Sequence, residues 1–436
     1  MMKFLLFCVM IPSCSPGLLT PLVHVMTRSL SHADHELRKL SSWISSIQDD
    51  LHYNVRFRGN LMLELQRIHP SPLSAVVTGA LGGIGRELCK KLANNVINNQ
   101  SLTIFSRMNK LVELNDFAAQ LGKHVHPRTM NLTSTNVNDL LSAMMDHADE
   151  IRNSSGIDLL LHAAGLLEKR CSVQEIHSVN YYAPFLLSLT LLPDMLANSH
   201  HPVVLFVGSS SHLRGSLPTS SFPPQSPISR LFSLSNKPNA LAVISAYADA
   251  KLRLLLAATA MDRRLESTGC IVRTAHPGLV DTPMLQGYFT NMSFPWRKHF
   301  LRSPAEGAAA VLLPALTIFD VILYTPPLST MSNSVHGIHT GLSWMQTHKD
   351  YRKSYYVNGK SAPHKCSELV NDIQVCESCY QDTIREIKCA NESVRTRLIS
   401  RIRQAGPIID LNDQLTAEMK IRRKQALLAL ALDIDS

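Results

Sequence analysis

The sequence lacks several features that would assign it to a simple class. Its uncharged N-terminal stretch, residues 4–26, is interrupted by Pro12, Pro16 and Pro21, so it does not predict one unbroken membrane-spanning helix. No internal repeats are present. Only 18% of the residues are charged and 45% are hydrophobic, which excludes a polar, disordered chain. With 436 residues, the chain is expected to be globular and larger than one ordinary domain.

The nine cysteines do not form a paired pattern. The densest group comprises Cys366, Cys376, Cys379 and Cys389, and it contains a single Cys-x-x-Cys pair. Zinc sites usually have two close pairs of ligands, so no metal site is predicted. The helical spacing of the apolar residues around this group predicts instead that its cysteines lie on a helix face.

A nucleic-acid-binding motif is also missing, although the formal net charge is +9. Residues 395–424 contain eight basic and three acidic residues, so +5 of this excess lies near the C-terminus. Such a segment is more often a solvated helix face than a binding patch, and no nucleic-acid partner is expected.

The N-terminal residues have the features of a leader. Residues 1–30 contain a short apolar segment after Lys3, which leaves a signal sequence, a membrane anchor and an inert extension open. Association with an endomembrane such as the endoplasmic reticulum is favoured, and the cytoplasm is the alternative. Residues 31–72 are expected to form a helical extension, with an amphipathic helix over 33–51. Packing against the main domain is favoured for this helix over contact with a membrane surface.

From residue 73 onward, short apolar strands alternate with helices, which predicts a Rossmann-type doubly wound parallel sheet flanked by helices. The main domain is expected to span 73–390, with long irregular inserts at 212–240 and 318–350. A basic helical tail, 391–436, follows as a C-terminal extension, with a helix over about 412–432. The predicted strands are Leu73–Thr78, Leu102–Ser106, His124–Met130, Ile157–Ala163, Val203–Gly208 and Ile271–Ala275.

A glycine-rich turn joins the first predicted strand to the next helix. Residues 78–85 read Thr-Gly-Ala-Leu-Gly-Gly-Ile-Gly, with Gly79, Gly83 and Gly85 at the characteristic spacing and Ile84 between the last two. Glycines there permit a tight turn and let backbone N–H groups approach a pyrophosphate at the positive end of the helix.

A tyrosine and a lysine lie one helical turn apart in the run Ser-Ala-Tyr-Ala-Asp-Ala-Lys. Tyr247 and Lys251 share a helix face at i and i+4. A cation near a phenol favours the phenolate, so Lys251 is expected to lower the pKa of Tyr247 and make it an acid–base group for an alcohol oxygen.

The end of the second predicted strand indicates the choice of cofactor. Arg107 stands where an NAD site would have a carboxylate for the ribose diol, and it can pair with a 2′-phosphate instead. Lys110 adds positive charge nearby. NADP(H) is therefore the expected cofactor.

On these motifs the chain resembles the short-chain dehydrogenase/reductase family, and within it the retinol-dehydrogenase-like branch. The likeness covers residues 73–285, and more weakly extends to 385. It implies a catalytic tetrad of Asn180, Ser209, Tyr247 and Lys251. The tripled serine at 209–211 leaves the position of the serine open by one residue. The resemblance also implies that cofactor is bound by Gly79, Gly83, Ile84, Gly85, Arg107, Asn131, Leu132, Ala164, Gly165, Tyr247, Lys251, Pro277, Gly278, Val280 and Thr282.

Three departures from the family pattern stand out. Its Asn-Asn-Ala-Gly appears as His162-Ala163-Ala164-Gly165, from which lower stability is expected sooner than lost binding. The Asp-Leu pair that meets the adenine is Asn131-Leu132, whose amide oxygen can still accept a hydrogen bond. An unusually long insert separates Ser209 from Tyr247.

The resemblance implies an NADP(H)-dependent oxidoreductase that interconverts an alcohol and a carbonyl on a lipophilic, retinoid-, steroid- or other lipid-like substrate. Tyr247 would transfer the proton, Ser209 would stabilise the oxygen, Lys251 would hold the nicotinamide ribose, and Asn180 would position a water. The alternative is a catalytically weak or inactive Rossmann-fold scaffold that acts through protein interactions. A membrane surface and a second copy of the chain remain open as partners.

Overall fold

The computed structural model describes residues 35–56, 61–62, 73–94, 100–152, 156–168, 170–217, 240–288, 301–324 and 354–436. An eight-stranded sheet forms the centre, in the order β3-β2-β1-β4-β5-β6-β7-β8. Strands β1 to β7 pair in parallel, and β8 pairs antiparallel with β7. The strands are β1 (Ala75–Thr78), β2 (Leu102–Ser106), β3 (Val125–Thr129), β4 (Leu159–His162), β5 (Val203–Val207), β6 (Ile271–His276), β7 (Tyr355–Val357) and β8 (Lys360–Ser361).

The predicted doubly wound sheet is confirmed. The chain runs outward from β1 to β3 and then returns to the other side of β1 with β4, so the order reverses between β1 and β4. Each predicted strand occurs, with ends that differ by at most two residues. Strands β1 and β4 are buried throughout, as in a parallel sheet covered on both faces. Ligands of such sheets bind at the carboxyl ends of the strands beside this reversal.

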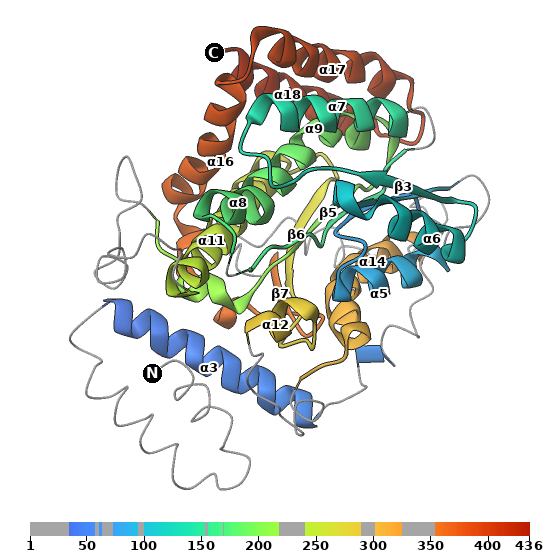
Figure 1. Cartoon of the computed structure of the whole chain (residues 1–436). Coiled ribbons are helices and arrows are strands. Elements are labelled where there is room, and N and C mark those ends of the chain that lie inside the picture. Colours follow the sequence, from blue (N-terminus) through green and yellow to red (C-terminus); the bar gives the residue numbers. More distant parts are fainter. Residues whose placement is uncertain are drawn as a thin grey trace, which may run out of the picture.

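Helices cover both faces of the sheet (Figure 1). One face carries α5 (Gly83–Ala93), α6 (Leu111–Leu121) and α14 (Pro304–Tyr324), whose buried apolar residues belong to one core cluster. The other carries α7 (Val137–Arg152), α9 (Ala183–Asn198) and α11 (Ala240–Arg264), which belong to a second. The short α8 (Val173–His177) and α12 (Pro283–Tyr288) lie toward the carboxyl ends of the strands.

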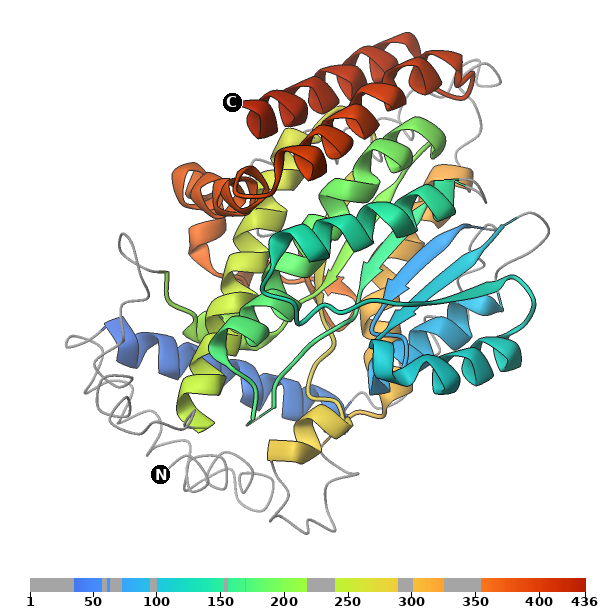
Figure 2. The same ribbon diagram turned by 45° about the horizontal axis from the view of Figure 1, so that its top comes forward.

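Three C-terminal helices form an outer layer on the α9 and α11 side (Figure 2). They are α16 (Ile373–Lys388), α17 (Glu392–Leu411) and α18 (Ala417–Asp435). Helix α18 corresponds to the helix expected over 412–432, whereas α17 was expected only as part of the basic helical tail, without bounds of its own. Cys376 and Cys379 are buried on α16, which agrees with the helix-face interpretation, and Cys389 is exposed just beyond it. The interpretation is wrong for Cys366, which is buried before α16, directly after a short 3-10 turn. Among the described residues, no cluster of His, Cys, Asp and Glu could hold a metal ion.

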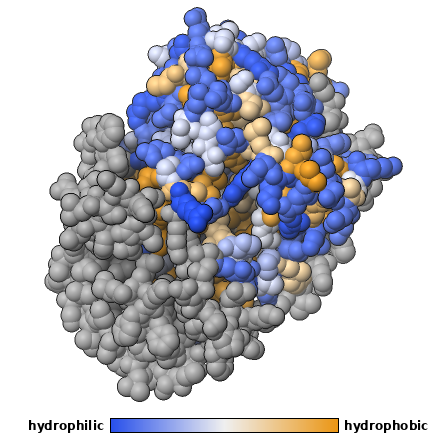
Figure 3. Space-filling model, in the orientation of Figure 1, coloured by the Kyte–Doolittle hydropathy of each residue, from blue (hydrophilic) through white to orange (hydrophobic). Residues whose placement is uncertain are grey.

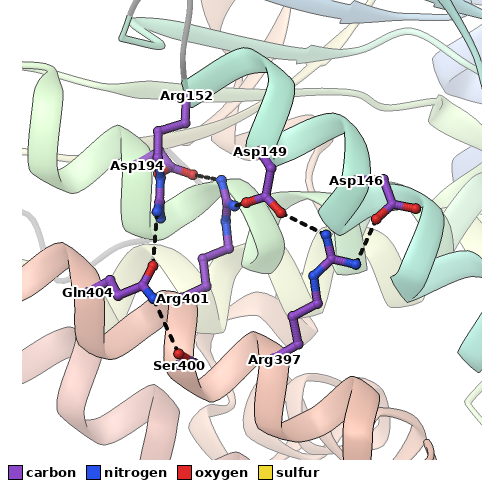
Figure 4. Close-up of polar contacts among 8 residues, drawn as sticks. All are labelled: Asp146, Asp149, Arg152, Asp194, Arg397, Ser400, Arg401 and Gln404. Carbon is purple, nitrogen blue, oxygen red and sulfur yellow. Dashed lines mark hydrogen bonds and ion pairs between the residues drawn. The ribbon is translucent and has the colours of Figure 1, made fainter.

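The expectation that the basic C-terminal residues form a solvated face is wrong for two of them. Arg401 is 4% exposed and Arg423 is fully buried. Figure 4 shows the first contact: Arg401 of α17 pairs with Asp149 of α7 and Asp194 of α9. Arg397 pairs with Asp149 as well, at 2.7 Å. Arg401 is buried with acidic partners from its own chain, whereas Arg423 is buried against backbone carbonyls such as that of Thr268.

The inserts were predicted only in part. Residues 318–324 were expected to be irregular, but they continue α14 as a helix, since none of these seven residues is proline or glycine and the next proline is Pro326. The remainder of that insert, and residues 218–239 of the other, lie outside the described residues. So does the leader, up to residue 34. Within the described part of the chain, none of the helices is both long and apolar enough to span a lipid bilayer.

The amphipathic helix predicted over 33–51 is α3 (His35–Arg56). It packs against the main domain, as favoured, and Ile47 and Leu51 of its apolar stripe are buried there. Figures 1 and 2 show it crossing the molecule near the start of α11 and near α12.

Candidate active site

The glycine turn after β1 permits backbone contacts that larger residues would prevent. Gly79 has φ +74°, and a Cβ there would lie 2.6 Å from the backbone of Ala164. A Cβ on Gly85 would lie 2.0 Å from the carbonyl oxygen of Gly79. Helix α5 then begins at Gly83, with no side-chain cap on Gly82 and no acidic residue in its first turn. Its N-terminal amides and positive dipole end therefore fit an anion such as a pyrophosphate.

Distant segments meet around this turn. The hydroxyl of Thr78 accepts a hydrogen bond from the amide of Ala164 at 3.3 Å. A Cβ on Gly83 would lie 2.9 Å from the Thr282 methyl, and one on Gly165 would lie 3.1 Å from the Met284 methyl. The glycine turn, the end of β4 and the segment after β6 therefore lie together at the carboxyl ends of the strands, although they are far apart in sequence.

Tyr247 lies on α11 beside the end of β5. The side chain of Ser209, the second residue after β5, lies beside the Tyr247 hydroxyl and favours the ionised form of the phenol. Ser209 rather than Ser210 thus makes the contact with Tyr247. Lys251, one turn along α11, is 4% exposed and donates from Nζ to the carbonyl oxygen of Val207 at 2.8 Å.

The expected lowering of the Tyr247 pKa by Lys251 is not what the structure shows. Burial raises the pKa of Tyr247 to about 12, and the Ser209 side chain offsets only part of this rise. Burial also lowers the pKa of Lys251 to about 8. Lys251 Nζ lies 5.7 Å from the centroid of the tyrosine ring and is bonded to Val207, so its charge is not directed at the phenol oxygen.

Asn180 lies at the centre of a single π-helical turn, Ser178–Tyr182, that joins α8 to α9. Its side chain is fully buried, and Nδ2 donates to the carbonyl oxygens of Leu166 and Ile176, both at 2.8 Å. Its Oδ1 accepts from the amide of Leu166 at 3.2 Å. The asparagine therefore fastens the loop after β4 to α8, which fixes this side of the site.

His162 replaces the first amide of the family pattern and interacts within the core. Its Nε2 lies 2.8 Å from the hydroxyl of Ser188, which itself donates to the Pro184 carbonyl, so Nε2 carries the proton. The ring stacks on Phe206 with centroids 4.9 Å apart. Burial, and then Lys251, lower the His162 pKa to about 3, so the ring is neutral. It links β4, β5 and α9.

His212 was not singled out from the sequence, yet it holds the serine turn. The amide of Ser367 donates to its Nε2 at 3.2 Å, so Nδ1 carries the proton and donates to the Ser209 carbonyl at 2.7 Å. Burial lowers the His212 pKa to about 4, so the ring stays neutral. The only local signal was its position three residues after Ser209.

The other end of the site lies at β2 and β3. Arg107 directly follows β2, and its guanidinium is exposed and paired with Glu168 at 3.1 Å. Lys110 pairs with Glu113 at 2.8 Å. After β3, Asn131 accepts hydrogen bonds from Thr133, and the Leu132 carbonyl accepts one from Ser178.

The segment after β6 has a tight turn at Pro277 and Gly278, where Gly278 has φ +80°. Arg302 donates to the Pro277 carbonyl at 2.8 Å and pairs through its backbone with Val280.

The space-filling view shows the face of the molecule that is seen in Figure 1. Hydrophobic residues gather in the middle of this face, whereas the C-terminal helices above them present a mainly hydrophilic surface (Figure 3).

These features define a class: an α/β protein of the Rossmann type, with a glycine turn at the reversal of its sheet and a tyrosine–serine contact beside it. The family model for short chain dehydrogenases matches residues 74–221. Over this part the chain is similar to the short-chain dehydrogenase/reductase family, and its relatives include retinol-dehydrogenase-like proteins.

Among its relatives is human dehydrogenase/reductase SDR family member 13, which is 28% identical over 252 residues, 56% of this chain and 62% of that protein. Mouse polyprenol dehydrogenase is 29% identical and covers 55% of this chain and 70% of its own length. Human retinol dehydrogenase 12 is 24% identical, with coverages of 55% and 72%. The chain therefore spans less than two thirds of the first of these relatives.

Solved structures also resemble this chain. A short-chain dehydrogenase from Shigella flexneri is 20% identical and has a TM-score of 0.43, covering 58% of this chain and 87% of its own. One from Sphingobium yanoikuyae, in complex with NADPH, is 19% identical with a TM-score of 0.41, covering 56% and 84%.

Proposed function

We propose that this chain is an NADP(H)-dependent oxidoreductase that interconverts an alcohol and a carbonyl. The observation that carries the proposal is that the Ser209 side chain lies beside the Tyr247 hydroxyl and favours its ionised form, with Lys251 one turn along the same helix. Two hydroxyl groups placed in this way can act on one substrate oxygen: the first exchanges a proton with it, and the second stabilises its developing charge by a hydrogen bond.

The residues around the glycine turn fit a dinucleotide. The cradle between Gly79, Gly85 and Ala164 excludes side chains, and the start of α5 offers amides to a pyrophosphate. Arg107, exposed at the end of β2, supports the choice of a 2′-phosphate. The binding set would be Gly79, Gly83, Ile84, Gly85, Arg107, Asn131, Leu132, Ala164, Gly165, Tyr247, Lys251, Pro277, Gly278, Val280 and Thr282.

Each catalytic side chain has a distinct role in this proposal. The nicotinamide, when bound, supplies or accepts the hydride. Tyr247 holds its proton at neutral pH, since its pKa is raised, and passes it to the carbonyl oxygen during reduction. Ser209 donates a hydrogen bond to the same oxygen. Lys251 contacts the ribose, and Asn180 fixes the backbone around a water in the proton path.

A lipophilic substrate is proposed on two grounds. The ring of Tyr247 packs with Leu167 and Cys171 against a small apolar cluster of Ile176, Val243 and Ala246. Two relatives are named polyprenol dehydrogenase and retinol dehydrogenase. We further propose that the enzyme resides at an endomembrane, with residues 1–30 as its signal or anchor. Deleting those residues should move the chain to the soluble cell fraction, and a full-length chain already found there would contradict this location.

The function is tested with Tyr247→Phe and a panel of retinoids, steroids and other lipophilic carbonyls, run with both cofactors. Loss of the acid–base hydroxyl should lower kcat by about 10²- to 10⁴-fold and leave NADPH affinity nearly unchanged. Tyr356→Phe, a half-buried tyrosine on β7, is the matched control and should retain activity. Turnover of Tyr247→Phe within tenfold of wild type would remove Tyr247 from the mechanism.

A further inference from the structure

Helix α3 lies outside residues 74–221 that match the family, yet it docks directly against the candidate active site. Its first half contacts the turn that follows Ser209. The guanidinium of Arg214 lies 4.6 Å from the ring centroid of Trp43, and Lys39 donates to Ser216 at 3.1 Å. Figures 1 and 2 agree in placing α3 beside the start of α11 and α12.

Its second half makes a buried contact with the end of β6. Oδ2 of Asp50 lies 2.8 Å from Nε2 of His276, and their exposed fractions are 0% and 4%. The other carboxylate oxygen and the other ring nitrogen are buried without a hydrogen-bond partner among the described residues. Because burying such groups has a high desolvation cost, the pair adds little net stability, and its physical effect is to fix geometry.

One turn further along α3, Asn54 makes a second buried contact. Its Oδ1 accepts from Nε of Arg302 at 2.6 Å, and both residues are 3% exposed. The same guanidinium donates to the Pro277 carbonyl at 2.8 Å and to Asn358. It also fills the space beside Gly278, where a Cβ would lie 2.5 Å from Nη1. Arg302 thus ties α3 to the Pro277–Gly278 turn.

The segment held in this way continues to the glycine turn. Asp281 donates its amide to the Arg302 carbonyl at 2.9 Å, and the Thr282 methyl faces Gly83. In the proposed function, this segment binds the nicotinamide end of the cofactor. One side of the segment after β6 therefore faces the proposed cofactor site. Asp50 and Asn54 of α3 hold its opposite side through His276 and Arg302.

We propose that α3 is a positioning element of the nicotinamide half of the site. Asp50, through His276, and Asn54, through Arg302, hold the segment 276–282 in the conformation that binds the nicotinamide end. Coupling is reciprocal, so cofactor binding in turn fixes α3 to the domain. This inference rests on the proposed function, and it assigns no contact between α3 and the reacting atoms.

The two halves of the cofactor site lie on different parts of the sheet, which makes the inference testable. The proposed adenosine end lies at β2 and β3, whereas α3 holds the end of β6, and β1, β4 and β5 lie between them. Loss of an α3 contact should therefore weaken NADPH but not 2′,5′-ADP, which carries the adenosine and the 2′-phosphate without the nicotinamide.

The experiment measures the dissociation constants of NADPH and 2′,5′-ADP on the full chain, with NADH and 5′-AMP in parallel. The variants are Asp50→Leu and Asn54→Leu. His52→Ala, exposed on the same helix, is the matched control. We expect NADPH to bind at least about fivefold more weakly to both variants, with 2′,5′-ADP unchanged. Asn54→Asp keeps an oxygen acceptor for Arg302, so it should bind NADPH with nearly wild-type affinity, unlike Asn54→Leu.

Equal weakening of both ligands would mean a general structural defect, and unchanged NADPH affinity would mean no coupling. Either outcome overturns the inference. If the wild-type chain binds neither NADPH nor NADH, the proposed function is wrong and the inference falls with it.

A second measurement needs no variant. On the wild-type chain, NADPH should slow amide hydrogen exchange in residues 47–56, and 2′,5′-ADP should not. Protection by both ligands, or by neither, would also overturn the inference.

Discussion

Burial acts in opposite directions on the two side chains that lie one turn apart on α11. It disfavours the charged form of each, so the pKa of Tyr247 rises to about 12 and that of Lys251 falls to about 8. At neutral pH the phenol is therefore protonated and most of the lysine is charged. A local sequence pattern predicted the pair, but the sign of the effect on Tyr247 depends on burial, which the pattern does not contain.

Lys251→Met should abolish turnover while stabilising the fold at pH 7. Burial holds the folded-state pKa of Lys251 below its ordinary value of 10.5, so the folded chain binds fewer protons than the unfolded chain between pH 8 and 10.5. Wild-type stability should rise over that window. The methionine should therefore raise the free energy of unfolding by at most about 3 kcal/mol below pH 8. The lost hydrogen bond to Val207 reduces this gain, and the gain should shrink toward pH 10.5.

Urea unfolding at pH 7 and at pH 10 measures the gain. A gain that is the same at both pH values would show that Lys251 does not titrate in this range.

Arg107 should set cofactor preference, and Glu168 should limit it. The wild type is expected to bind NADPH about ten- to a hundredfold more tightly than NADH, and Arg107→Asp should reverse this order. In the structure Glu168 pairs with Arg107 at 3.1 Å and competes with a 2′-phosphate for it. Glu168→Gln should then tighten NADPH by up to about fivefold, since exposed ion pairs are weak, and leave NADH unchanged.

Glu266→Gln, which changes an exposed carboxylate in the turn after α11, serves as the control. Equal wild-type affinities for the two cofactors would refute the assignment of Arg107 without any variant.

Contacts within a few residues were accessible from the sequence, and distant ones were not. The glycine turn and the Tyr247–Lys251 pair are spacings within one turn or helix. His212 depends on Ser367, which is 155 residues away, and the partner of Asp50 is 226 residues away. A single sequence holds no record of such pairings, so these residues were missed.

At the scale of elements, prediction followed the strength of the periodic signal. Strands β1, β2, β4, β5 and β6 were found because each is a short, mostly apolar run between helices, whereas the edge strand β3, Val-His-Pro-Arg-Thr, carries a weaker apolar signal. Strand β7 has three residues and β8 has two, which is too few for an alternating pattern. Helix α17 was predicted only as part of the basic helical tail, without bounds, because it is rich in basic residues and contains Pro407, although Leu398, Ile402 and Ile409 bury one face.

The docking of α18 should depend on one buried side chain. Arg423 donates to the Thr268 carbonyl at 2.8 Å, and to the Leu196, Ser199 and His200 carbonyls at the end of α9. Arg423→Ala would leave these acceptors buried without donors, so it should lower the free energy of unfolding by about 3 kcal/mol.

Arg422, on the same helix, has a side chain that is 51% exposed. Arg422→Ala should change stability by no more than about 0.5 kcal/mol. Urea unfolding compares the two variants, and similar values for both would contradict a docking role for Arg423.

At the scale of the whole molecule, the C-terminal helices share a core with the sheet domain. Phe185 of α9, Leu256 of α11, Tyr380 of α16, Ile402 of α17 and Leu427 of α18 belong to one apolar cluster. The basic composition of the C-terminal residues suggested a boundary at residue 391. Composition does not reveal that α17 and α18 cover apolar residues of the sheet domain. The shared cluster favours one cooperative unit.

Thermal unfolding of the full chain should therefore show a single transition that the cofactor moves as a whole. At a hundredfold excess over its dissociation constant, NADPH should add about 2.7 kcal/mol of stability. With the unfolding entropy of a chain of this length, that corresponds to a rise in Tm of about 3 °C. Scanning calorimetry tests both points, because equal calorimetric and van't Hoff enthalpies indicate one unit. Two transitions, of which NADPH shifts only one, would show that α17 and α18 unfold separately from the nucleotide-binding sheet.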